Sequence, residues 1–160
     1  MRETVYLSLG SNIGDRQGHL REALERLNGL ARVTAVSPFY ETEPVEFTEQ
    51  EWFVNCAAAI ETVQTPEWLM SALLELERQM GRVRFEKKGP RTIDLDILLF
   101  GERVVNTPGL TIPHPGMATR RFVLAPLAEI APEARHPVLK KTIRQLLAEL
   151  PAGQPIIRLP

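Results

Sequence analysis

The chain of 160 residues has a single cysteine, Cys56, which excludes an internal disulfide framework and fits a reducing cytoplasm. Cys56 lies in the small-residue run Val54-Asn55-Cys56-Ala57-Ala58, where a packed core thiol is favoured over a nucleophile. The sequence also lacks repeats, low-complexity tracts and any apolar run long enough for a signal peptide or a transmembrane helix. We therefore expect a cytoplasmic protein with no membrane partner.

The sequence also has no large excess of positive or negative charge. The formal net charge is −1 at pH 7, which argues against general attraction to nucleic acid but leaves room for a local basic patch. Charged residues make up 24% of the chain and hydrophobic residues 44%, as in ordinary globular proteins. A chain of this length buries about two-thirds of its unfolded surface, so we expect residues 1–160 to form one domain.

Apolar periodicity and turn residues predict a mixture of strands and helices. Thr65-Pro66-Glu67 gives the clearest helix start, because it combines an N-cap residue, a first-turn proline and an acid near the helix N-terminus. The expected strands span residues 4–9, 32–36, 39–42, 52–60 and 94–100. The expected helices run from Asp15 to Gly29, from Thr65 to Gly81, from Thr119 to Pro126 and from Thr142 to Leu150.

The strand from Asp94 to Phe100 places two carboxylates in an apolar run. Alternation predicts that Asp94, Asp96, Leu98 and Phe100 share one face, and that this strand is central in its sheet. The two aspartates, with Cα atoms roughly 6 to 7 Å apart, repel each other unless a cation lies between them. Mg²⁺ prefers such oxygen ligands, often together with substrate phosphates. The alternative is a strand that begins at the surface with two solvated aspartates.

A basic segment leads directly into this strand. It contains Arg82, Arg84, Lys87, Lys88 and Arg91 against the single acid Glu86. Arginines grip phosphate oxygens, so cations and metal-binding carboxylates together predict a Mg²⁺–triphosphate site. The alternative is a solvated loop in which Arg91 pairs with Asp94.

Each of four further features allows two interpretations, one structural and one functional. The turn Gly10-Ser11-Asn12-Ile13-Gly14-Asp15 follows a strand, but it lacks the complete phosphate-loop pattern, which favours a simple tight turn. Asn55 lies among apolar residues and must bond either to backbone or to a ligand. His114, between two prolines, could donate to a phosphate or ribose, or merely pack. Phe122 could be a core residue or a stacking platform.

Taken together, these motifs resemble the 6-hydroxymethyl-7,8-dihydropterin pyrophosphokinase family over nearly the whole chain. The most specific match is the segment from Gly89 to Gly101. The other matching motifs are Leu9-Gly10-Ser11-Asn12, Ser37-Pro38-Phe39-Tyr40-Glu41-Thr42, Phe53-Val54-Asn55, Gly81-Arg82-Val83-Arg84, Pro113-His114 and Arg120-Arg121-Phe122.

The resemblance implies a folate-pathway enzyme that moves pyrophosphate from ATP to a pterin alcohol, 6-hydroxymethyl-7,8-dihydropterin. It also implies an α+β fold of ferredoxin-like type, a mixed sheet with helices packed on both faces. Asp94 and Asp96 would bind two Mg²⁺ ions that bridge the ATP phosphates. Arg82, Arg84 and Arg91 would join them as catalytic residues.

The same resemblance supplies the binding residues. ATP would contact Glu77, Arg82, Arg91, Ile97, Thr111, His114 and Arg120. The pterin would lie between Phe53 and Phe122, with its hydrogen-bonding edge read by Asn55 and by Thr42, Pro44 and Val45. Lys88 stands where some members carry a loop tryptophan, and Leu74 and Gly109 replace polar or basic nucleotide contacts.

Two other function classes remain to be tested. One is a binding module that keeps the fold without the chemistry, although the presence of both aspartates, Arg82 and Arg91 argues against it. The other is a nucleic-acid binder that uses the basic loop, but the broad positive surface of such proteins is lacking. We expect a monomer with no nucleic-acid partner.

Overall fold

The computed structural model describes residues 2–43, 51–81, 92–153 and 155–160. Groups of strands are separated by helices along the chain. In order, they are β1 (Glu3–Ser11), α1 (Arg16–Leu30), β2 (Arg32–Val36), β3 (Tyr40–Thr42), β4 (Phe53–Thr62), α2 (Pro66–Gln79), β5 (Asp94–Phe100), β6 (Val105–Thr107), β7 (Leu110–Ile112), the short 3₁₀ helix η1 (Met117–Thr119), α3 (Arg121–Ile130), α4 (Ile143–Glu149) and β8 (Ile156–Arg158). The five predicted strands and four predicted helices are therefore present.

The starts of α1, α2 and α4 agree closely with their predicted capping residues. The predicted bounds of the third helix are wrong, because α3 begins at Arg121 without a side-chain cap and continues through Pro126 to Ile130. The Asp15 carboxylate accepts from the backbone N–H of Gly18, and the Thr65 hydroxyl accepts from that of Trp68. Thr142 and Gln145 form a reciprocal capping box at the start of α4. These bonds satisfy N–H groups that the first helical turn leaves without helical partners.

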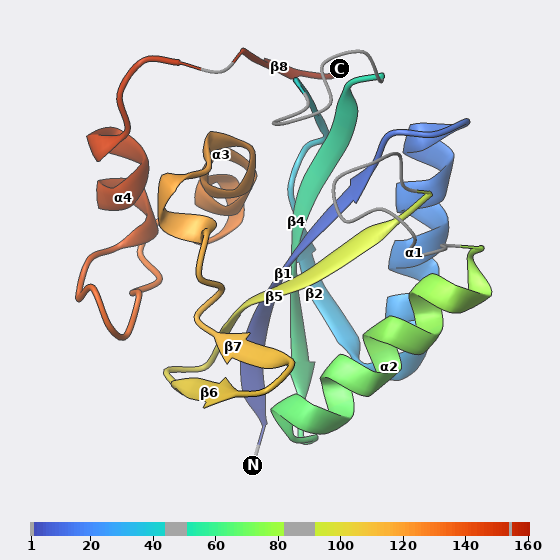
Figure 1. The fold of residues 1–160 in the computed structure, drawn as a ribbon, viewed down its shortest axis with the longest axis horizontal. Coiled ribbons are helices and arrows are strands. Elements are labelled where there is room, and N and C mark those ends of the chain that lie inside the picture. The colour runs from blue at the N-terminus through green and yellow to red at the C-terminus, as the bar shows by residue number, and fades with distance from the viewer. Residues whose placement is uncertain (1, 44–50, 82–91, 154) are drawn as a thin grey trace.

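The main sheet has the strand order β5-β1-β4-β3-β8, and β2 also pairs with β4 (Figure 1). Every pairing among these described strands is antiparallel. The predicted mixed sheet is therefore wrong. The reason is that β1 and β2, joined through α1, run parallel to each other but are separated by β4, which runs in the opposite direction.

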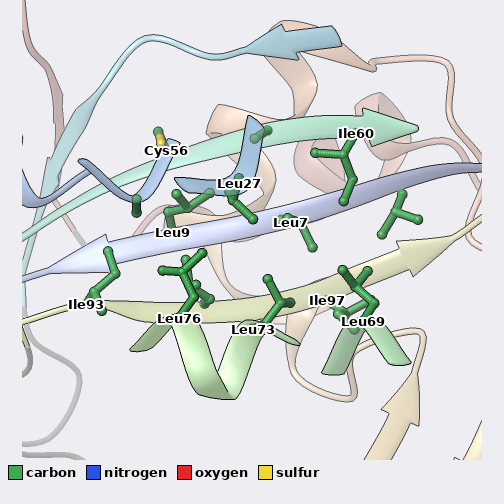
Figure 2. Packing of buried hydrophobic residues seen from close by; sticks show 14 of the residues in the cluster. Leu7, Leu9, Leu27, Cys56, Ile60, Leu69, Leu73, Leu76, Ile93 and Ile97 are labelled. Atoms are coloured by element: carbon green, nitrogen blue, oxygen red, sulfur yellow. The ribbon is translucent and has the colours of Figure 1, made fainter. Parts of the chain in front are cut away.

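Helices cover both faces of the sheet, as predicted (Figure 1). On one face, Leu20 and Leu27 of α1 and Leu69 and Leu73 of α2 pack over alternate apolar residues of the strands (Figure 2). Helical residues three, four or seven apart form such a stripe because they lie on the same side of the helix. Cys56 is buried in this layer as a free thiol, and burial raises its pKa to about 12.

The opposite face is covered by α3 and α4. Val123, Leu124 and Leu127 of α3 and Ile143 of α4 pack with Ala57 of β4 in a second cluster. Phe122 is half-buried against this cluster. This face also carries the polar residues of the candidate site.

A bulge in β5 corrects the predicted alternation. Leu7 of β1 pairs with Ile97 and Tyr6 pairs with Leu99, so Leu98 is an extra residue between the two pairs. Asp94, Asp96 and Leu98 share a face as predicted, but Leu99 joins Leu98 in the second cluster and Phe100 turns to the first. The strand is also at one end of the described sheet rather than central, although residues on both of its faces are buried and only Asp94 and Asp96 are partly exposed.

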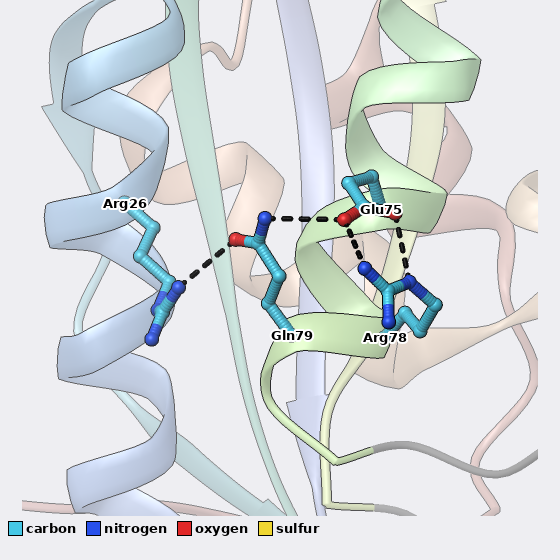
Figure 3. Close-up of polar contacts among 4 residues, drawn as sticks. All are labelled: Arg26, Glu75, Arg78 and Gln79. Carbon is cyan, nitrogen blue, oxygen red and sulfur yellow. Dashed lines mark hydrogen bonds and ion pairs between the residues drawn. The ribbon is translucent and has the colours of Figure 1, made fainter.

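Polar side chains connect α1 and α2 at their exposed sides. Arg26 of α1 donates to Gln79 at 3.1 Å, and Gln79 donates to Glu75 at 3.2 Å (Figure 3). Arg78 also pairs with Glu75, three residues earlier on the same helix. Such exposed contacts contribute little to stability individually. None of the helices described is long and apolar enough to cross a membrane.

Candidate active site

Three neighbouring strands place an amide, a glycine and a carboxylate in one row. Gly10 of β1 pairs with Asn55 of β4 on one side and with Asp94 of β5 on the other. Residues directly opposite each other in a sheet project from the same face. Two interstrand spacings separate the outer members, so the Cα atoms of Asn55 and Asp94 lie about 10 Å apart. The row therefore has room for a ligand that contacts both ends.

The Asn55 end is buried and ordered by hydrogen bonds. The Thr42 hydroxyl donates to Asn55 Oδ1 at 2.5 Å, and the two residues are 1% and 4% exposed. Phe53 is the register partner of Thr42 and lies two residues before Asn55 on the same face. A β-carbon added to Gly10 would lie 2.7 Å from Asn55 Nδ2 and 3.4 Å from the Phe53 ring. The side chains of Asn55 and Phe53 thus pack closely over the backbone of Gly10.

The carboxylate end carries Asp94 and Asp96. Asp96 is opposite Ser8 and shares the face of Asp94, and its side chain is 42% exposed. Two carboxylates at this spacing fit the oxygen-rich ligand set of a hard divalent cation. Within the described ranges, no group of three or more His, Cys, Asp and Glu side chains is placed to hold a metal ion. Any cation held here would thus draw further ligands from a substrate, from water or from residues outside those ranges.

His114 lies beside Asp96, with 4.0 Å between its Nε2 and Asp96 Oδ1. Its backbone N–H donates to the carbonyl of Leu98, and its Nδ1 accepts from the N–H of Gly116. A neutral ring with Nδ1 as acceptor carries its proton on Nε2. Burial, and then the charge of Arg120, lower the pKa of His114 below 6.5 against the opposing effect of Asp94. At neutral pH the ring therefore presents an N–H donor toward the carboxylates.

A pocket of about 270 Å³ opens next to Asp96 and His114. Ile97 and Thr111 line it too, so the structure brings together four of the predicted site residues. The rest of the lining consists of Met70, Gly109, Leu110 and Pro115. The sequence did not indicate Met70, because an apolar residue in an amphipathic helix has no feature that distinguishes it from a core residue. The volume approaches that of a small-molecule site.

Arg120 and Phe122 border the same face at the start of α3. The guanidinium carbon of Arg120 lies 5.8 Å from the centre of the Phe122 ring. Arg120 also acts electrostatically on His114. Phe122 is therefore close to a cation that itself lies near the carboxylate end of the row.

Comparison with known proteins then adds a finding independent of this geometry. Residues 6–132 match the family model described as 7,8-dihydro-6-hydroxymethylpterin-pyrophosphokinase, or HPPK. The chain belongs to the HPPK family. The Bacillus subtilis protein named 2-amino-4-hydroxy-6-hydroxymethyldihydropteridine pyrophosphokinase is 48% identical over 132 residues, which cover 81% of this chain and 79% of that protein.

Longer proteins also contain an HPPK-like region. The Schizosaccharomyces pombe folic acid synthesis protein fol1 is 43% identical over 150 residues, which are 92% of this chain but 20% of that protein. The chain thus spans about a fifth of that relative. A Plasmodium falciparum HPPK-DHPS crystal structure has a TM-score of 0.76 at 18% identity, and the match covers 93% of this chain and 42% of that one. This likeness shows a shared fold.

The HPPK resemblance assigns Glu77 to the ribose, but Glu77 does not lie with the other predicted ATP residues in the pocket. Its carboxylate accepts from the backbone N–H of Leu95 at 2.7 Å, and the residue is 2% exposed. It is not among the described residues that line the 270 Å³ pocket. Its geometry indicates that it joins α2 to β5, and its contact with ribose stays a prediction.

Five of the predicted HPPK site residues lie outside the described residues. They are Pro44, Val45, Arg82, Arg84 and Arg91. Their roles stay predictions. The structure also reveals one relationship that the sequence did not indicate, which is the position of Gly10 between Asn55 and Asp94.

Proposed function

We propose that this protein transfers pyrophosphate from ATP to the hydroxymethyl group of 6-hydroxymethyl-7,8-dihydropterin, giving the pterin diphosphate and AMP in folate biosynthesis. Membership of the HPPK family supports this reaction. The structural observation that carries it is the row of Asn55, Gly10 and Asp94, which separates an amide from a carboxylate pair across two strand spacings.

The amide end suits a flat heterocycle. Asn55 has a fixed amide group that can read donors and acceptors on a pterin edge, and Thr42 fixes its orientation. Phe53 and Phe122 lie on the same face of the sheet and supply aromatic surfaces for the two sides of the ring. We infer that Pro44 and Val45 complete the contacts with the pterin edge.

The carboxylate end suits the nucleotide. The pocket lined by Ile97, Thr111 and His114 would take adenosine and direct its phosphates toward Asp96. Asp94 and Asp96 would hold Mg²⁺, two ions in our proposal, which when bound neutralises phosphate charge. Arg120 and the Nε2–H of His114 add positive charge and a donor there. We infer that Glu77, Arg82, Arg84 and Arg91 act on the same nucleotide.

The reaction forms one bond and breaks one. The hydroxymethyl oxygen attacks the β-phosphorus of ATP in line, the bond from that phosphorus to the α,β-bridging oxygen breaks, and AMP leaves with the electron pair. The hydroxyl proton passes to solvent. The protein's residues contribute mainly by holding both substrates in line and by stabilising charge on the transferred group.

The same proposal covers the setting of the reaction. We infer a single domain over residues 1–160, a ferredoxin-like arrangement of its first five strands and two helices, and a monomer that acts without nucleic acid or a membrane. The buried free thiol of Cys56 supports a reducing, cytoplasmic location.

The direct test supplies the protein with ATP, Mg²⁺ and the pterin alcohol and separates the nucleotides by chromatography. AMP in equal amount to pterin diphosphate is the expected result. ADP would replace the proposal with ordinary phosphoryl transfer, and neither product would favour a binding module.

Two variants locate the chemistry. Asp94→Asn and Asp96→Asn should each lower AMP formation by about 100-fold or more, because each removes one carboxylate from the proposed cation site. Asp15→Asn is the matched control, since asparagine caps a helix about as well as aspartate. Near-normal turnover in both site variants would contradict the assignment.

A further inference from the structure

Arg16 makes two short contacts that bridge neighbouring strands. Its Nη1 lies 2.7 Å from Glu41 Oε2 on β3 and donates at 2.7 Å to the backbone carbonyl of Trp52, next to the start of β4. The Arg16 and Glu41 side chains are 26% and 28% exposed, so the pair is partly shielded from water. One guanidinium nitrogen therefore joins β3 to the residue that precedes β4.

The location of Arg16 in its helix indicates that these contacts outweigh a local disadvantage. It is the first residue of α1, where a positive charge opposes the helix dipole. The α1 N-cap is already supplied by Asp15. Arg16 thus contributes nothing evident to the start of the helix, and its described contacts are with the strands.

Each contact lies next to a residue of the proposed pterin site. Glu41 immediately precedes Thr42, and Trp52 immediately precedes Phe53. Thr42 and Phe53 are themselves register partners at the end of the β3–β4 ladder. Arg16 therefore ties together the chain neighbours of both members of this pair.

The contacts reach the sheet from behind the site. Glu41 pairs with Val54, which is buried in the core layer of α1 and α2. Thr42 and Phe53 project from the opposite face because side chains alternate along a strand. Arg16 is thus separated by the sheet from any ligand that lies on Phe53.

Asn12, in the same β1–α1 turn, adds a parallel contact. Its Nδ2 donates to the carbonyl of Glu51 at 3.4 Å, and the residue is buried. Two consecutive carbonyl groups, those of Glu51 and Trp52, are therefore held by one side chain from the turn and one from the first residue of α1. The Asn12 contact gives the β1–α1 turn a structural role beside that of Gly10 in the site.

We propose that Arg16 is a positioning residue for the pterin site, which holds the strand ends that carry Thr42 and Phe53 at the spacing that bound pterin requires. This inference rests on the proposed function. Loss of Arg16 frees both strand ends and leaves Glu41 without this partner, so the aromatic ring and the Thr42 hydroxyl lose their fixed separation. Binding groups that lose their preorganised spacing bind the ligand more weakly, because binding must then supply the ordering.

The test compares steady-state constants of Arg16→Ala with those of the wild type. The expected result is a KM for the pterin raised about tenfold, with KM for ATP and kcat changed less than about twofold. Arg16→Lys, which keeps one charged donor, should recover part of the loss. Glu41→Gln keeps the bond from Arg16 to Trp52, and its effect should be smaller than that of Arg16→Ala.

Arg26→Ala is the matched control, because Arg26 lies on the same helix, pairs with Glu22 and bonds to α2. It should leave all three constants unchanged.

If wild-type protein releases AMP but Arg16→Ala keeps its pterin KM within about twofold, or loses kcat alone, the positioning role is wrong and the proposed function stands. If Arg16→Ala does not fold, an unchanged pterin KM in Glu41→Gln and Arg16→Lys overturns the role. If wild-type protein releases no AMP, both proposals fail.

Discussion

Thr42 fixes the orientation of Asn55 through a 2.5 Å hydrogen bond to Oδ1 inside the protein. Because Oδ1 is engaged there, Nδ2 is directed over Gly10. An amide with one orientation distinguishes a ligand that presents an acceptor from one that presents a donor. The pair therefore gives the proposed site a means of selecting a heterocycle by its hydrogen-bonding edge.

Replacing Thr42 should test this orientation. Thr42→Val keeps the shape but removes the donor, and we expect KM for the pterin to rise about tenfold, since a lost buried hydrogen bond is worth about 1–3 kcal/mol. Thr42→Ser keeps the hydroxyl and should stay near the wild-type value. Equal KM values for the two variants would show that the hydroxyl does not orient Asn55.

Gly10 should resist even the smallest side chain. A β-carbon there would lie 2.7 Å from Asn55 Nδ2, and Asn55 cannot yield freely because Thr42 holds it. Gly10→Ala should therefore raise the pterin KM several-fold, as measured by initial rates. Gly29→Ala is the control, because nothing lies within 4 Å of a β-carbon there and alanine favours the helix by about 0.5–1 kcal/mol. An unchanged pterin KM in Gly10→Ala would contradict the close approach.

Glu77 should stabilise the fold. Glu77→Ala leaves the buried N–H of Leu95 without this acceptor, so the free energy of unfolding in urea should fall by about 1–3 kcal/mol. Glu77→Gln keeps a carbonyl oxygen and should lose less. A Glu77→Ala variant of normal stability but with a raised KM for ATP would instead assign the side chain to the nucleotide alone.

His136 should make stability depend on pH. Its Nδ1 accepts from the N–H groups of Val138 and Leu139, and burial lowers its pKa below 6.5. The unfolded chain therefore takes up the proton first, so the contribution of His136 is complete above about pH 6.5 and is lost as the pH falls through the lower folded-state pKa. Urea unfolding of the wild type and His136→Asn across this range measures the effect. The variant should show a flatter profile, and identical profiles would exclude His136 as the cause.

Local signals in the sequence predicted the elements well. The cap at Thr65 and the apolar run from Asp94 to Phe100 depend on neighbouring residues alone, and both elements begin where expected. The shared face of Asp94 and Asp96 follows from the same short-range alternation.

Long-range relationships were harder to predict. Strand alternation alone cannot reveal that β4 lies between β1 and β2, nor that Leu98 is an extra residue opposite β1. Ile97, Thr111 and His114 line one pocket, and only the family resemblance predicted that they would contact the same ligand. The sequence did not indicate the role of Arg16, because an arginine after a turn has no local pattern that points to partners 25 and 36 residues away.

The bulge at Leu98 gives β5 a length that cannot be changed without damage. The carbonyl of Leu98 accepts a hydrogen bond from the backbone N–H of His114. Because Leu98 is an extra residue, Leu99 packs in the second cluster and Phe100 in the first. Deletion of Leu98 would move Leu99 and Phe100 to opposite faces of the sheet and would also remove the hydrogen bond to His114. A protein engineer should therefore keep the length of β5 fixed and vary charge only at Asp94 and Asp96, because the other five side chains of the strand are buried.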